Sequence, residues 1–278
     1  MKNLSNLTIV LTPVYEDLES LQILTKKIDE LFDDVFFLII DDCSVKNSIT
    51  PDTVSFFDSS GEIINLPKNL GHQGAISFGL NYLNKHYTDY KNIVIMDSDG
   101  EDTPESIALL KKEIEKNEID LIVASRKSRQ NTFAFKSFYY LYKMLFFYFA
   151  GVRLDFGNFM ILKKKALIEL LSLKELDIHI AASVIKSGVH YTSLQLDRGY
   201  RYKGESRMNF VGLVLHGLRS LVVLYPLVTR RASFIIGFLI LLVFFFSFDS
   251  LVYVLLGLHC IFYSFLFLYK NKFNQNMN

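Results

Sequence analysis

Short apolar runs alternate with amphipathic stretches along the first two thirds of the chain. The apolar runs predict strands at residues 7–12, 36–40, 62–66, 93–96 and 119–124. Between them, apolar side chains recur every three or four residues, which is the spacing of one helix face. Strands that alternate with helices are typical of a largely parallel sheet. The pattern therefore predicts an α/β fold for this part of the chain.

Three of the amphipathic stretches have clear helical spacing. They run from Leu18 to Leu31, from Ile76 to Leu83 and from Ile107 to Ile114. Pro104 precedes the third repeat, and proline suits the first turn of a helix because its missing N–H would have no partner there. A later aromatic-rich stretch, residues 133–149, is also predicted as a helix, either in the core or against lipid.

Two nearly uncharged runs, 233–248 and 251–269, dominate the end of the chain. Each is close to the short end of the roughly 17–25 residues that cross a bilayer. Basic pairs flank their outer ends, so the positive-inside rule places both termini in the cytoplasm. We predict a transmembrane hairpin that makes this a multi-pass protein of the inner (plasma) membrane. The alternative is a pair of buried core helices.

These patterns predict four segments. They are a catalytic domain at 1–208, a juxtamembrane interfacial region at 209–232, the hairpin at 233–270 and a cytoplasmic tail at 271–278. The second segment is apolar but interrupted by His216 and Arg219, which favours a helix lying at the membrane surface. No signal peptide is expected, because residues 1–8 are polar.

Charge and cysteine content narrow the function further. With 30 Lys+Arg against 29 Asp+Glu, the chain has no basic field that would indicate nucleic-acid binding. Cys43 and Cys260 lie far apart in unlike surroundings, which fits a reducing compartment. The sequence leaves the oligomeric state open, a homo-oligomer included.

A carboxylate cluster directly follows the strand predicted at 93–96. It consists of Asp97, Asp99, Glu101 and Asp102. Ligands of parallel sheets bind beyond the carboxyl ends of the strands, and oxygen ligands suit Mg²⁺ or Mn²⁺. An exposed acidic turn is the alternative. An EF-hand loop is excluded by its spacing, because Asp102 stands where that loop needs glycine.

Five motifs in order resemble glycosyltransferase family 2 over most of the first 210 residues. They are Thr12-Pro13-Val14-Tyr15-Glu16, Asp41-Asp42-Cys43-Ser44, Asn69-Leu70-Gly71-His72-Gln73-Gly74-Ala75, Asp97-Ser98-Asp99-Gly100-Glu101-Asp102-Thr103-Pro104-Glu105 and Ser125-Arg126. The stretch 197–207 is similar to the Arg-x-x-Arg-x-x-Gly-x-Ser-Lys region of the polyprenyl-phosphate branch. That branch includes dolichol-phosphate mannose synthase and bacterial undecaprenyl-phosphate sugar transferases.

The resemblance implies a Rossmann-like GT-A fold, a nucleotide-sugar donor, a polyprenyl-phosphate acceptor and Mg²⁺ or Mn²⁺. For the nucleotide sugar it implies Pro13, Tyr15, Glu16, Asp42, Lys68, Gly71, Asp97, Ser98 and Arg126. For the acceptor phosphate it implies Arg198, Arg201, Ser206 and Arg207. Asp97, Asp99 and Glu101 would hold the metal, and Asp99, Asp155 and Arg201 would carry catalysis. A solvated basic loop near the membrane is the alternative for the arginines.

Two residues depart from the family pattern. Glu101 replaces the usual Gln of Asp-x-Asp-x-Gln, and Asn158 stands where the family often has its base. An amide cannot take a proton at neutral pH. Either Asp155 substitutes, or the acceptor is a phosphate that needs positioning rather than deprotonation.

We therefore predict an inverting enzyme that transfers a single sugar. The chain has no Trp, which excludes the Gln-x-x-Arg-Trp motif of processive synthases. The alternatives are a transferase of the same fold that glycosylates a hydroxyl of a lipid-linked saccharide, and a catalytically silent membrane protein that binds a nucleotide sugar. The sugar and the nucleotide are not encoded in any motif that we identify.

Overall fold

The fold was obtained from a computed structural model that describes residues 2–54, 61–116, 118–126, 133–204, 210–246 and 250–275. The chain forms two compact units. The first contains residues 1–129 and 155–207, and the second contains residues 130–154 and 208–278. The predicted catalytic segment 1–208 therefore contributes to both units, because its aromatic-rich part groups with the C-terminal helices.

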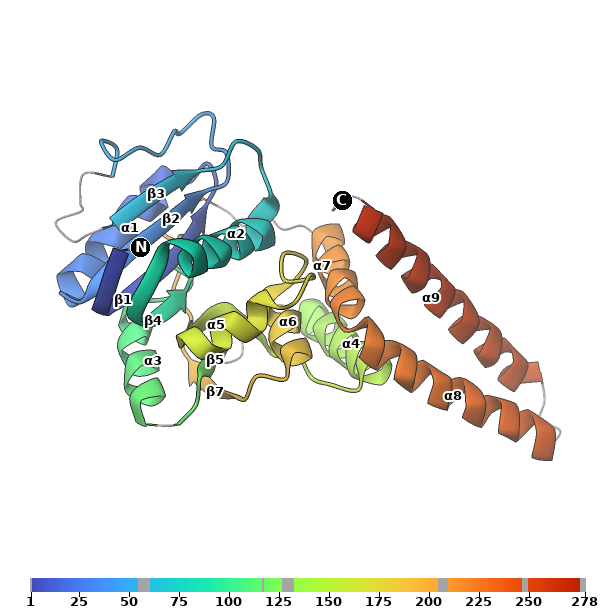
Figure 1. The fold of residues 1–278 in the computed structure, drawn as a ribbon. Coiled ribbons are helices and arrows are strands. Elements are labelled where there is room, and N and C mark those ends of the chain that lie inside the picture. Colours follow the sequence, from blue (N-terminus) through green and yellow to red (C-terminus); the bar gives the residue numbers. More distant parts are fainter. Residues whose placement is uncertain are drawn as a thin grey trace. The chain divides into compact units, whose positions relative to one another are not determined.

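A seven-stranded sheet forms the centre of the first unit (Figure 1). Its order is β3-β2-β1-β4-β6-β5-β7. The strands are β1 (Lys2–Val14), β2 (Val35–Asp41), β3 (Gly61–Asn65), β4 (Tyr87–Ile95), β5 (Leu121–Arg126), β6 (Phe156–Leu162) and β7 (Tyr191–Leu196). All neighbours pair in parallel except β6, which is antiparallel to both β4 and β5. The prediction of an α/β fold with a mostly parallel sheet is confirmed.

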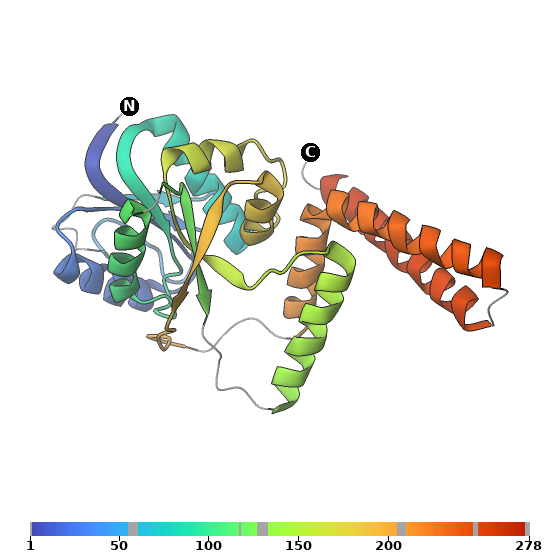
Figure 2. The same cartoon turned by 90° about the horizontal axis from the view of Figure 1, so that it is seen from below.

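Helices cover both faces of this sheet (Figure 2). On one face, α1 (Leu18–Leu31) and α3 (Pro104–Lys116) bury their apolar residues against β1, β2 and β4. On the other face lies α2 (Gly71–His86), whose Gly79 approaches Leu11 and Ile40 so closely that an added Cβ would lie 2.5 Å from Leu11 Cδ1. The short helices α5 (Lys164–Leu171) and α6 (Ile180–Ser187) complete the unit. Pro104 begins α3, as its sequence position predicts.

The two strands that the pattern missed have physical reasons for escaping it. In β7 the exposed and half-buried residues outnumber the single buried Leu196, so its apolar signal is weak. In β6, Gly157 and Asn158 follow Phe156 and interrupt the apolar run. Both strands are neighbours of β5, and they extend the sheet beyond β4.

The second unit is helical. It contains α4 (Phe133–Ala150), α7 (Phe210–Val223), α8 (Tyr225–Phe246) and α9 (Ser250–Gln275). By length and composition, two segments could cross a membrane, Tyr225–Val243 and Val252–Lys272, with mean hydropathy 1.8 and 1.9. Only 11% of each segment is buried, which disfavours the alternative of two core helices.

The structure moves the start of the first apolar helix upstream of the predicted hairpin boundary. Because α8 begins at Tyr225, Arg230 and Arg231 lie inside it rather than before it. Arginine is a good helix former, and its long side chain can reach a polar environment from within an apolar helix. Arg231 does so by donating from Nε to the carbonyl oxygen of Tyr148 at 2.8 Å.

A polar contact also joins α4 to α9 within this unit. The hydroxyl of Tyr148 lies 2.6 Å from Nε2 of His259, and Nδ1 of His259 lies 2.7 Å from the carbonyl oxygen of Leu255. A carbonyl oxygen can only accept, so Nδ1 carries a proton and donates it to Leu255. The imidazole therefore has partners for both nitrogens, as a polar group in an apolar helix requires.

Candidate functional site

An acidic loop, residues 97–103, follows β4 and precedes α3. It turns at Gly100, whose φ of +89° is a left-handed conformation that side chains rarely adopt. A Cβ at Gly100 would also lie 2.7 Å from the ring of Tyr202. The loop is largely enclosed, because Ser98, Asp99 and Asp102 are buried.

A second segment, residues 197–204 after β7, crosses this loop and is called the strap below. Two backbone hydrogen bonds join them, from Gly199 N to Glu101 O at 2.9 Å and from Tyr202 N to Asp99 O at 2.8 Å. Glycine at 199 permits the close approach, because a Cβ there would lie 2.4 Å from the Gly100 carbonyl oxygen. The predicted phosphate-binding arginines are thereby placed against the predicted metal-binding carboxylates.

Each of two strap arginines is paired with a carboxylate of the acidic loop. Arg201 Nη1 lies 3.0 Å from Asp99 Oδ2, and Arg198 pairs with Glu101. The remaining donors are less well satisfied. Nε and Nη1 of Arg198 and Nε of Arg201 are buried without a hydrogen-bond partner among the described residues. Buried guanidinium donors are costly to leave unpaired, so the strap is suited to receive an anion.

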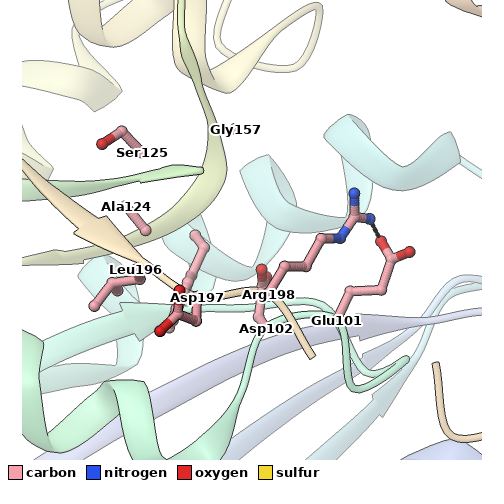
Figure 3. A pocket seen from close by; sticks show the side chains of 9 residues that line it. Glu101, Asp102, Ala124, Ser125, Gly157, Leu196, Asp197 and Arg198 are labelled. Carbon is pink, nitrogen blue, oxygen red and sulfur yellow. Dashed lines mark ion pairs between the residues drawn. The ribbon is translucent and has the colours of Figure 1, made fainter. Parts of the chain in front are cut away.

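A small pocket lies beside this pairing (Figure 3). Its lining includes Glu101, Asp102, Ser125, Gly157, Asp197 and Arg198. In Figure 3 the side chains of Arg198 and Glu101 point toward each other, whereas Asp197 points away from them. The pocket thus brings together the acidic loop, the ends of β5 and β7 and the start of β6.

His72, at the start of α2, contacts two residues that the sequence had singled out. Its Nε2 lies 3.2 Å from Asp97 Oδ1 and 3.0 Å from Asn158 Nδ2. Desolvation lowers the pKa of His72, but the charge of Asp97 and its hydrogen bond, together with Asp102 and Asp99, raise that pKa by more. The net result is a pKa above the ordinary value, which favours the imidazolium form.

The three carboxylates predicted to hold the metal do not converge on one point. Among the described residues, no three His, Cys, Asp or Glu side chains form a group that could hold a metal ion. Instead Asp97 faces His72, Asp99 faces Arg201 and Glu101 faces Arg198. Asp97 and Asp99 still offer the oxygen donors that Mg²⁺ and Mn²⁺ prefer. A metal site on them requires the facing cations to shift, and the metal assignment stays a prediction.

On the opposite flank of the sheet edge, two predicted nucleotide-binding carboxylates hold loops in place. Glu16 has φ +51° and accepts from the backbone N–H groups of Val45, Lys46 and Asn47 at 2.7 to 3.1 Å. Those hydrogen bonds, from Lys46 first, lower the pKa of Glu16. Asp42 is buried and accepts from Leu70 N at 2.6 Å, and burial raises its pKa.

The remaining predicted residues fall into three groups. Exposed or half-exposed near the ends of strands or helices are Tyr15, Lys68, Gly71 and Asp155. Buried are Pro13 in β1 and Ser98 in the acidic loop. Outside the described residues are Ser206, Arg207 and the side chain of Arg126. The structure thus collects the acidic loop, the strap and His72 at one edge, and it leaves the roles of all these residues as predictions.

Sequence reasoning missed several residues of this edge. The motifs assign no role of their own to His72, Ser125, Gly157 and Tyr202. The available signal was Gly199 directly after the charged pair Asp197-Arg198, because an isolated glycine in such a stretch can indicate a close backbone approach. Contacts such as those of His72 with Asn158 join distant parts of the chain and have no local pattern.

Comparison with known proteins identifies the family. The family model for glycosyl transferase family 2 matches residues 9–171, which include the acidic loop and β6. An uncharacterized glycosyltransferase of Bacillus subtilis (strain 168), YkcC, is 27% identical over 209 residues, or 71% of this chain and 62% of that protein. The chain thus spans 62% of the length of this curated relative.

Solved structures share the fold at low identity. Glucosyl-3-phosphoglycerate synthase from Mycobacterium tuberculosis, in complex with Mn²⁺, UDP-glucose and phosphoglyceric acid, has a TM-score of 0.53 and 14% identity, covering 81% of this chain and 80% of that one. TarS 1–349 from S. aureus has a TM-score of 0.52 and 13% identity, covering 86% and 72%. The fold is therefore of the GT-A kind, and by the match of more than half its length the chain belongs to glycosyl transferase family 2.

Proposed function

We propose that this protein is a membrane-anchored, inverting glycosyltransferase that moves one sugar from a nucleotide sugar to a polyprenyl phosphate. In this reaction an oxygen of the acceptor phosphate attacks the anomeric carbon. A new carbon–oxygen bond forms, and the bond to the nucleoside diphosphate breaks. The bonding pair leaves with the diphosphate, so the product is a glycosyl phosphodiester.

The donor side of the proposal rests on the acidic loop at the carboxyl end of β4. Asp97 and Asp99 would hold Mg²⁺ or Mn²⁺, which would neutralise charge that develops on the leaving diphosphate. The solved M. tuberculosis synthase of the same fold was crystallised with Mn²⁺ and UDP-glucose, which supports this class of donor. Tyr15, 43% exposed after β1, has an aromatic ring suited to packing against a nucleoside base.

The acceptor side rests on one observation above all, the strap arginines whose buried donors have no partner among the described residues. A phosphate monoester has a second pKa of about 6 and is largely dianionic at neutral pH, so it attacks without a protein base. It does need cations, and Arg198 and Arg201 supply guanidinium forks. A hydroxyl acceptor has the opposite needs, a base and few cations.

The second unit supports a lipid acceptor through its composition. Apart from Asp249, residues 130–154 and 208–278 contain no acidic residue, and they contain eight Lys and Arg residues. Such a basic, apolar unit is attracted to anionic bilayer surfaces and can remain embedded through its long helices. An acceptor that stays in the membrane would then be held near the enzyme by the same bilayer.

A donor panel tests the proposal. Purified full-length protein in detergent, with Mn²⁺ and polyprenyl phosphate, is given radiolabelled nucleotide sugars one at a time. We expect one donor to place label in the lipid fraction, as seen by thin-layer chromatography. Label that enters only a lipid-linked saccharide would favour the hydroxyl-acceptor enzyme. If no donor is consumed with any acceptor, the silent nucleotide-sugar-binding protein replaces both.

Membrane topology gives a second prediction. In a variant with Cys43 and Cys260 changed to Ser, a cysteine placed at position 249 should react with a membrane-impermeant reagent added outside intact cells. A cysteine placed at position 275 should react only after the cells are opened, because basic residues keep both ends of the hairpin inside. The reverse labelling pattern would place the catalytic unit outside and contradict the proposed orientation.

A further inference from the structure

We propose that Glu101 is a positioning residue that aims Arg198 at the anionic group of the acceptor, and that it is not a metal ligand. The inference rests on the proposed function for the identity of the acceptor. It departs from the assignment that the sequence resemblance implies, in which Glu101 joins Asp97 and Asp99 around the metal.

The side chain of Glu101 points toward Arg198. Its carboxylate pairs with the guanidinium of Arg198, and Figure 3 shows the two side chains meeting end to end. Asp99 is paired with Arg201, whose Nη1 lies 3.0 Å from Asp99 Oδ2. Each carboxylate thus has its own guanidinium, and no metal-binding group of three includes Glu101 among the described residues.

The backbone of Glu101 is also fixed to the strap. Its carbonyl oxygen accepts from Gly199 N at 2.9 Å, and its own N–H donates to Asp99 Oδ1 at 2.9 Å. A residue whose carbonyl is bonded to the strap and whose N–H is fixed within the acidic loop is well placed to orient Arg198. To reach a metal between Asp97 and Asp99, its side chain would have to leave this pairing.

The charges of Arg198 and Glu101 are poorly solvated. The side chains of Arg198 and Glu101 are 15% and 20% exposed, so both charges are mostly removed from water. Breaking a pair of this kind is costly, because it leaves an uncompensated charge in a poorly solvated place. A glutamine, the usual family residue, would lack the charge that holds a guanidinium.

Arg198 keeps hydrogen-bond donors that Glu101 does not use. Glu101 engages Nη2, while Nε and Nη1 are buried without partners in the described part of the chain. Arg198 is also one of the residues that line the pocket, together with Ser125 and Gly157. The anionic group of a phosphate could accept from these remaining donors. The pair with Glu101 therefore fixes the guanidinium while leaving donors of Arg198 for the acceptor.

Glu101→Gln separates the two roles by binding measurements that need no turnover. Mn²⁺ is titrated alone and with UDP and followed by electron paramagnetic resonance, and farnesyl phosphate is titrated by calorimetry. We expect Mn²⁺ affinity to stay within twofold of the wild type and farnesyl phosphate affinity to fall about tenfold. Glu105→Gln, an exposed carboxylate four residues further on, serves as the matched control and should change neither.

A double-mutant cycle with Arg198→Ala tests whether Glu101 acts through the arginine. In the Arg198→Ala background, Glu101→Gln should have no further effect on farnesyl phosphate binding. A tenfold loss of Mn²⁺ affinity in Glu101→Gln, additive losses in the cycle, or unchanged farnesyl phosphate binding would each overturn the proposal. Because these are binding measurements, a failure to detect sugar transfer would count against the proposed function and not against this role. Melting temperatures verify that each variant is folded.

Discussion

Asp99→Asn is expected to lower kcat about a hundredfold or more, which is the largest single effect that the account predicts. Asp99 is buried in the acidic loop after β4 and is a proposed ligand of the metal that would compensate the leaving diphosphate. Such Lewis-acid compensation is worth several kcal/mol, and about 3 kcal/mol corresponds to about two orders of magnitude in rate. Initial rates with saturating donor, across a range of Mn²⁺ concentrations, measure the loss.

A matched substitution at the other end of the same strand provides the control. Asp89 is exposed in β4, so Asp89→Asn should retain the wild-type rate. Removing the metal with excess chelator should reproduce the Asp99→Asn defect in the wild type. Full turnover in excess chelator would instead remove the metal from the mechanism, and with it the proposed role of Asp99.

The second large effect is expected from Arg201→Ala, and it should exceed the effect of Asp155→Asn. Arg201 would lose a bidentate contact to a phosphate, which is worth about 2–4 kcal/mol, or roughly 30- to 1000-fold in rate. Asp155 is exposed just before β6, and a phosphate dianion has no proton for it to take. Its amide variant should therefore lose less than about threefold in rate, because exposed substitutions usually have small effects. Rates at saturating donor and Mn²⁺ compare the two variants.

The pairing of Arg201 with Asp99 makes one further control necessary. The Arg201→Ala substitution also removes the cation that faces Asp99, whose side chain is only 12% exposed. A loss of rate could therefore come from a change at Asp99 and not from a lost phosphate contact. Arg201→Lys keeps the charge but not the planar fork, and we expect it to recover only part of the rate. If Asp155→Asn abolishes transfer while Arg201→Ala leaves it nearly intact, a hydroxyl is the acceptor.

The sequence was sufficient to predict the part of the site that follows regular strands. Strands β1, β2 and β4 end in strongly apolar runs, so their carboxyl ends could be located to within about two residues, and Asp42, Asp97 and Asp99 follow from those ends. The starts of β1 and β4 lie further upstream than the predicted ones, at Lys2 and Tyr87. Parallel strands bring their carboxyl ends to one edge, which is why residues from three separate motifs were expected together. Pro104 likewise fixed the start of α3.

The contacts between the strap and the acidic loop could not be predicted in this way. They depend on β7, a strand with one buried residue, and on the antiparallel strand β6, which lies between β4 and β5 in the sheet. The motif resemblance gave Glu101 to the metal, whereas its partner in the structure comes from the far end of the catalytic unit. Side-chain pairing between segments that distant has no periodicity that a sequence pattern could reveal.

The most direct test of the central claim compares two acceptors that differ only in the phosphate. Purified full-length protein, Mn²⁺ and the donor identified by the panel are incubated with polyprenyl phosphate or with the free polyprenol of the same length. The account predicts labelled lipid only with the phosphate, and a product that still binds an anion-exchange resin because the phosphodiester retains one charge. Labelled lipid formed from the free alcohol, with none from the phosphate, would contradict it.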